Sequence, residues 1–92
     1  MAEIIWSEKA LIDLREIESY IGKDSERYAL RVVIKIIERA SILNSFPLSG
    51  RMVPELDTFN FRELIEGNYR IIYRIVNDKV EILTVRHSAR LL

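Results

Sequence analysis

The sequence contains no cysteine, only one histidine, and no excess of charge of either sign. Without cysteine the chain can form neither a disulfide framework nor a thiolate metal site, which fits a reducing compartment. No run of 18 apolar residues occurs, so no transmembrane helix is predicted. The start, MAEIIWSEKA, lacks the basic residues and the long apolar stretch of a signal peptide. We therefore expect a cytoplasmic protein without a bound metal or cofactor.

The charged residues balance, with fourteen basic and fourteen acidic side chains. Most nucleic-acid-binding proteins carry a basic excess, because binding releases counterions from the phosphates. The chain as a whole lacks that excess. Its basic residues are unequal in type, since ten are arginine and four are lysine. Arginine favours two-point binding of a carboxylate or phosphate, although local surface ion pairs explain many arginines.

The first half of the chain predicts a short strand and two helices. With 49% hydrophobic and 30% charged side chains, residues 1–92 are expected to form one small domain. A β-prone stretch at 2–6 precedes Ser7, which is placed to cap a helix over roughly 8–21. After the break GKDS, a second apolar stripe continues to about residue 43. The two helices are therefore expected to form a hairpin.

The second half predicts a sheet. Both prolines lie in the connection 44–56, which excludes a helix or a central strand there. Three β-prone runs follow at 60–66, 69–76 and 79–86, separated by EGN and ND, which are typical of hairpin turns. The order β-α-α-β-β-β predicts an α+β fold, a mainly antiparallel four-stranded sheet with the N-terminal helical hairpin packed on one face.

The last hairpin can be placed in register from its turn. A two-residue turn at 77–78 pairs Arg74 with Glu81 and, further along, Arg70 with Val85. The side chains that alternate with the arginines on this strand then point toward the helices, namely Tyr69, Ile71, Tyr73 and Ile75. Arg74 has an ordinary explanation as the cross-strand partner of Glu81, worth about 0.2–1 kcal/mol. Arg70 has no acidic residue opposite it in this register.

Alternation then predicts that two distinctive side chains share one face. Arg70 and His87 are expected to emerge together on the side of the sheet away from the helices, which we call the open face. The register of strand 60–66 stays undecided. A two-residue turn at 67–68 places Glu63 on the open face, whereas a three-residue turn with a bulge places Arg62 there instead.

Four phrases of the sequence resemble, in order, the RelE/ParE superfamily of bacterial toxins from type II toxin–antitoxin modules. They are ALIDLREIESYI in the first helix, FPLSGR in the connection, FRELIEGNYRIIYRI in the sheet and EILTVRHSAR at the end. The resemblance covers nearly the whole chain. It implies a small antitoxin protein as partner, with operator DNA bound only through that antitoxin.

The resemblance implies two alternative mechanisms. ParE-like members bind and poison DNA gyrase, whereas RelE-like members cut mRNA on the ribosome through its own 2′-OH, without a metal. In the nuclease reading, Arg70 matches an active-site arginine, His87 can act as acid or base, and Arg62 joins them. Further contacts to phosphate or to a partner protein are expected from Arg51, Arg86 and Arg90.

Departures from the nuclease branch favour the gyrase reading. Many nuclease members end in a segment with a functional tyrosine or a further histidine, but no aromatic ring follows Tyr73 except that of His87. With a sequence pI near 6.6, the protein would gain little binding free energy from the release of counterions from RNA. A gyrase poison needs only a protein-docking surface, for which aromatic residues and arginine are suited. A third reading, an inactive paralogue that only binds an antitoxin, is also compatible with the sequence.

The predicted open face also bears on the antitoxin. Apolar side chains beside Arg70 would make it a poor solvent surface. We therefore expect an acidic, partly helical antitoxin segment that wraps the helices and reaches the edge of the sheet. The apolar residues concerned are Ile72, Leu83 and Val85.

Overall fold

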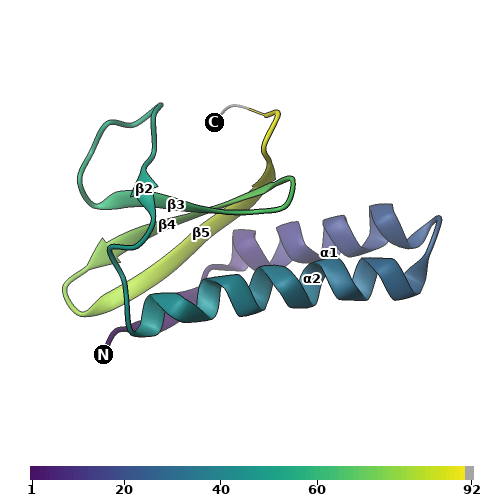
Figure 1. Ribbon diagram of the computed structural model, residues 1–92, viewed down its shortest axis with the longest axis horizontal. Coiled ribbons are helices and arrows are strands. Elements are labelled where there is room, and N and C mark those ends of the chain that lie inside the picture. The colour runs from purple at the N-terminus through teal and green to yellow at the C-terminus, as the bar shows by residue number, and fades with distance from the viewer. Residues whose placement is uncertain (91–92) are drawn as a thin grey trace.

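The computed structural model describes residues 1–90, so residues 91–92 of the predicted domain lie outside the described part of the chain. The predicted α+β class is confirmed, and the helices and the last three strands begin and end close to their predicted bounds (Figure 1). The elements in chain order are β1 (Glu3–Trp6), α1 (Glu8–Gly22), α2 (Glu26–Ser41), the 3₁₀ turn η1 (Ile42–Asn44), β2 (Arg51–Met52), β3 (Phe61–Glu66), β4 (Tyr69–Val76) and β5 (Lys79–His87).

The sheet has five strands in the order β1-β5-β4-β3-β2, one more than predicted. The additional strand is β2, a two-residue segment of the connection that pairs with the edge of β3. β1 runs parallel to β5, and the other neighbours are antiparallel. Figure 1 shows α1 and α2 side by side along one side of the sheet, while the loop after β2 and the C-terminal segment lie at the other. Within residues 1–90 no helix is long and apolar enough to cross a membrane.

Both helices begin at serine caps. The Ser7 hydroxyl accepts a hydrogen bond from the Ala10 N–H at 3.0 Å, and Ser25 does the same for Tyr28 at 3.1 Å. These bonds satisfy backbone donors that the first helical turn leaves unpaired. The helices then pack small and branched apolar residues against β4 and β5. The buried core contains Ala10, Leu14, Ile36, Ala40, Leu43, Leu64, Ile71, Tyr73, Val80, Ile82 and Val85.

A buried tyrosine anchors the proline-containing connection to this core. Tyr73 is fully buried, and its hydroxyl donates to the Pro47 carbonyl at 2.7 Å and accepts from the Gly50 N–H at 3.0 Å. A Cβ at Gly50 would lie 2.6 Å from both the Glu63 carbonyl and the Tyr73 hydroxyl, so only glycine fits. Burial raises the pKa of Tyr73, which keeps the hydroxyl protonated and able to donate.

The β4–β5 hairpin follows the predicted register only as far as its middle. Arg74 lies opposite Glu81, as predicted, but a bulge then leaves Leu83 as an extra residue on β5. Beyond the bulge, Arg70 lies opposite Arg86 rather than Val85. The predicted pairing of Arg70 was therefore wrong by one residue, and one residue of slip moves a side chain to the other face.

Polar groups of α1 occupy the edge of β5 at the bulge. The Ser7 hydroxyl donates to the Leu83 carbonyl at 2.9 Å. The Asp13 carboxylate accepts from the Val85 N–H at 3.0 Å and from the Thr84 hydroxyl. Because β1 pairs with β5 only up to residue 82, these side chains take over the hydrogen bonding that a longer edge strand would supply.

The register of β3 is resolved by a two-residue turn at 67–68. Glu63 lies opposite Ile72 and Ile65 lies opposite Arg70, so Glu63 shares the open face with Arg70. The alternative with a bulge, which would have placed Arg62 there, was wrong. Arg62 lies opposite Tyr73.

Candidate functional site

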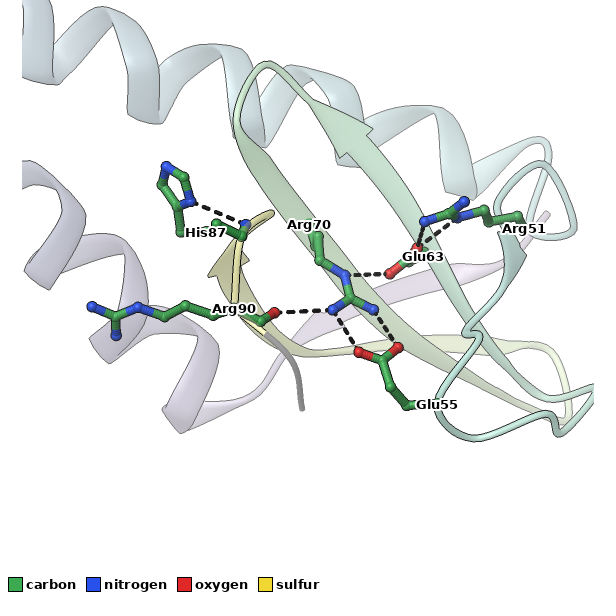
Figure 2. Close-up of polar contacts among 7 residues, drawn as sticks. Arg51, Glu55, Glu63, Arg70, His87 and Arg90 are labelled. Atoms are coloured by element: carbon green, nitrogen blue, oxygen red, sulfur yellow. Dashed lines mark hydrogen bonds and ion pairs between the residues drawn. The ribbon is translucent and has the colours of Figure 1, made fainter.

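The Arg70 side chain is 6% exposed and makes hydrogen bonds through all three of its nitrogens (Figure 2). Its Nε donates to a Glu63 oxygen at 2.7 Å. Its Nη2 and Nη1 donate to the two oxygens of Glu55 at 2.8 and 2.9 Å, which is the two-point geometry of a strong arginine–carboxylate pair. Nη1 also donates to the Arg90 carbonyl at 3.1 Å.

Glu63 links Arg70 to a second arginine. Its side chain is 0% exposed, and its other oxygen accepts from Arg51 Nε and Nη2, each at 2.6 Å. The four side chains Arg51, Glu63, Arg70 and Glu55 thus alternate in sign, and we call them the Arg70 network. The hydrogen bonds to Glu55 outweigh the opposing effect of burial and, with Glu63, raise the pKa of Arg70, so the guanidinium stays charged.

The network holds separate parts of the chain together on the open face. Arg51 belongs to β2, Glu63 to β3 and Arg70 to β4, while Glu55 comes from the loop after β2. The Arg90 carbonyl adds the C-terminal segment. On β5 the residue opposite Arg70 is Arg86.

His87 lies on the other face of the sheet. It is opposite Tyr69, and the two rings meet edge to face with centroids 5.7 Å apart. Its Nδ1 accepts from the Ala89 N–H at 3.2 Å, and Figure 2 shows the ring pointing away from the Arg70 network. The prediction that Arg70 and His87 share one face was therefore wrong, and the bulge at Leu83 is the physical reason.

Arg62 is also apart from Arg70. It donates to the carbonyls of Phe59 and Gly50, each at 3.1 Å, and its guanidinium lies 4.6 Å from the centre of the Phe59 ring. It therefore holds the connection against β3. The structure does not bring the three predicted catalytic side chains, Arg70, His87 and Arg62, into one site.

The apolar residues predicted on the open face are largely covered by the chain itself. Ile72 is buried, and Val85 belongs to the core beneath the helices because of the bulge. Leu83 is half-buried. We predicted from the sequence that an antitoxin covers these residues because they are exposed. That reason is wrong for Ile72 and Val85.

A groove of about 620 Å³ lies between α1 and the C-terminal half of β5, on the side where His87 emerges. Three residues predicted as partner contacts or catalytic groups meet there, Arg86, His87 and Arg90. Tyr20 and Tyr69 supply aromatic walls. The remaining lining residues are Lys9, Asp13, Glu16, Ile17, Val85 and Ala89.

Asp13, at the base of this groove, was missed by reasoning from the sequence. It accepts from Lys9, Thr84 and Val85, and these bonds outweigh its burial and lower its pKa. A signal existed, since Asp13 occupies a core-facing position between Ala10 and Leu14 in the apolar stripe of the helix. Glu55 was missed as well, and its place in an irregular loop carries no such periodic signal.

No group of three or more histidine, aspartate or glutamate side chains within residues 1–90 could hold a metal ion. On the open face Arg70 binds two carboxylates, and the groove beside α1 brings aromatic and charged side chains together.

Comparison with known proteins identifies the family. The profile described as "ParE toxin of type II toxin-antitoxin system, parDE" matches residues 4–92. The chain is 36% identical over 92 residues to Toxin RelE2 of Caulobacter vibrioides, covering 99% of this chain and 100% of the relative.

Solved structures share the fold. The chromosomal ParDE toxin–antitoxin system from P. aeruginosa matches with a TM-score of 0.78 at 24% identity, covering 95% of this chain and 96% of that one. The toxin–antitoxin complex RelBE2 from Mycobacterium tuberculosis matches with a TM-score of 0.69 at 23% identity, covering 94% and 96%. The chain is therefore a toxin of the RelE/ParE superfamily and belongs to the ParE toxin family of type II toxin–antitoxin systems.

Proposed function

We propose that this toxin acts in the cytoplasm by binding and poisoning DNA gyrase, as the ParE branch does, rather than by cutting RNA. The observation that carries the proposal is the separation of Arg70 from His87 on opposite faces of the sheet. RNA cleavage through the 2′-OH needs a charged donor for the phosphate and a proton acceptor or donor beside it. The carboxylates beside Arg70 are themselves engaged by arginine.

Binding to a protein needs no catalytic pair of side chains. It needs exposed aromatic and arginine side chains, and the surface has them. Tyr20, Tyr28 and Phe59 are exposed, and the groove beside α1 combines tyrosine walls with Arg86 and Arg90. Tyrosine and arginine are enriched among residues that dominate binding energy at protein interfaces. The zero net charge does not weaken such an interface, although it disfavours binding to RNA.

Ribosome-dependent mRNA cleavage is the second candidate, favoured by the similarity to a curated relative named Toxin RelE2. In that reading, His87 would have to work with a different cation from Arg70. Arg86 and Arg90 line the same groove as His87 and are the available choices.

We further propose a cognate antitoxin as the partner that neutralises the toxin. Solved relatives of this fold include toxin–antitoxin complexes. The basic side chains of the groove, Arg86, Arg90 and His87, suit an acidic antitoxin segment lying between α1 and the sheet edge. Binding to operator DNA would then occur through the antitoxin.

Gyrase supercoiling and primer extension on translated mRNA, run side by side with the purified toxin, test the proposal. We expect inhibition of supercoiling and no new mRNA ends. His87→Ala should leave supercoiling inhibition within about threefold of the unmodified toxin, because one rim side chain contributes little to a large interface. New mRNA ends that disappear in His87→Ala would establish the nuclease reading, and activity in neither assay would establish the inactive one.

A further inference from the structure

The loop between β2 and β3 is fastened to the open face by a charged side chain. Each of residues 54–60 is exposed as a whole residue, yet the side chain of Glu55 reaches the sheet and is only 24% exposed. Near the ends of the loop, Val53 is buried and Arg62 donates to the Phe59 carbonyl. The middle of the loop thus touches the sheet through Glu55, and exposed loops with few apolar anchors open at low cost.

The two carboxylates that bind Arg70 have different tasks. Glu63 is fully buried, is fixed by Arg51, and takes the Nε of Arg70. It would keep the guanidinium oriented even if Glu55 left. Glu55 takes Nη1 and Nη2, the parallel pair of donors with which arginine binds a carboxylate or phosphate at two points.

We propose that Glu55 is the built-in occupant of a carboxylate-binding site at Arg70, and that an acidic side chain of a partner protein replaces it when loop 54–60 swings outward. The proposal rests on the proposed function only in taking a protein, not RNA, as the source of the ligand. A planar carboxylate fits the site as observed, because it has the shape and charge of the Glu55 group that occupies these two donors.

Glu55 would then act as a competitor within the chain. A partner binds only the fraction of molecules in which the loop is open, so its apparent affinity is lowered by that fraction. Removing the charge of Glu55 should release Arg70 without disturbing Glu63. Glu66, at the end of β3, takes no part in the network and offers a matched control.

Labelling of arginines with phenylglyoxal, followed by peptide mass mapping of the whole chain, tests the loop directly. We expect Arg70 to react about tenfold faster in Glu55→Gln than in the unmodified protein, because the site is open in most molecules. Glu66→Gln should react like the unmodified protein. Equal protection of Arg70 in Glu55→Gln would overturn the proposal, since the loop would then not be held by Glu55.

A second experiment tests the ligand with two probes of equal length, hexaglutamate and hexauridylate, titrated while the Arg70 Nε–H signal is followed by NMR. Glu55→Gln should bind hexaglutamate about fivefold more tightly than the unmodified protein, and Glu55→Gln with Arg70→Lys should lose this gain. A gain for hexauridylate alone, or no gain for either probe, would overturn the carboxylate assignment. Neither experiment involves gyrase, so a toxin that fails to inhibit gyrase would remove the proposed function and leave this inference standing.

Discussion

The sheet buries ionised groups in two places, and the two are satisfied in different ways. Asp13 lies at the edge of β5 and is enclosed by groups from its own helix and one strand. Arg70 lies on the open face and draws its partners from one neighbouring strand, a loop and the C-terminal segment. The first arrangement fastens a helix to a sheet edge, whereas the second joins segments that are otherwise separate.

This difference is the reason that we propose a change of state at Arg70 and not at Asp13. Every partner of Asp13 is held by a regular element, so the site can open only if α1 leaves the sheet. One partner of Arg70, Glu55, stands in an exposed loop. A buried charge is tolerated only while it is paired, so an exchangeable partner makes a binding site and a fixed partner makes a structural contact.

The largest expected effect comes from breaking the Arg70 network. Arg70→Met removes the guanidinium that Glu63 and Glu55 share, and we expect the free energy of unfolding to fall by about 3–5 kcal/mol. Urea denaturation followed by circular dichroism measures it. A loss below about 1 kcal/mol would contradict the view that the network supports the fold. Loss of toxicity in an Arg70 variant therefore says nothing about catalysis unless its folding is measured.

The second largest loss of stability is expected at the edge of β5. Asp13→Ala removes the acceptor of the Val85 N–H and the Thr84 hydroxyl, and we expect a loss of about 1–3 kcal/mol in the free energy of unfolding. The Val85 amide should also exchange its hydrogen faster. Glu16→Ala, on the same helix and exposed, is the control and should cost less than about 0.5 kcal/mol. Equal losses for both variants would show that the hydrogen bonds of Asp13 to β5 do not stabilise the fold.

The dependence of stability on pH sharpens the comparison. The folded pKa of Asp13 lies below its ordinary value of 3.8, so its contribution is present above 3.8 and is lost as the pH falls through the lower folded value. The unmodified protein should therefore lose more stability than Asp13→Asn as the pH falls from ~5 to ~2. Parallel pH curves from urea denaturation would contradict this assignment.

The smallest expected effect belongs to the one correctly predicted ion pair. Arg74 and Glu81 are 44% and 34% exposed and lie opposite each other on β4 and β5. Solvent screens such a pair, so Arg74→Ala should change the free energy of unfolding by less than about 1 kcal/mol. A loss as large as that of Arg70→Met would mean that solvent exposure does not explain the different contributions of Arg70 and Arg74 to stability.

The sequence predicts the fold well because the fold rests on local signals. Ser7 caps the first helix as predicted, and the turns at 67–68 and 77–78 join the last three strands. The candidate site was predicted poorly because its geometry depends on the bulge at Leu83. Groups of α1 far away in the sequence bind β5 at this point, and a hairpin register counted from its turn cannot include them.

One signal in the sequence did favour the bulge. Strict alternation from Val80 and Ile82 puts Thr84 in the core and Val85 outside, whereas a slip of one residue puts Val85 inside, as observed. Glu55 could not have been found in this way, because irregular loops carry no periodic pattern that places a side chain.

The most direct test of this account is a proton NOE spectrum of the unmodified protein, with the side chains of Arg70 and His87 assigned. The account predicts cross-peaks between the His87 and Tyr69 rings, and between the Arg70 Nε–H and the Glu63 side chain. Cross-peaks between the His87 ring and the Arg70 side chain would place both on one face. That result would contradict the separation on which the choice of gyrase over RNA depends.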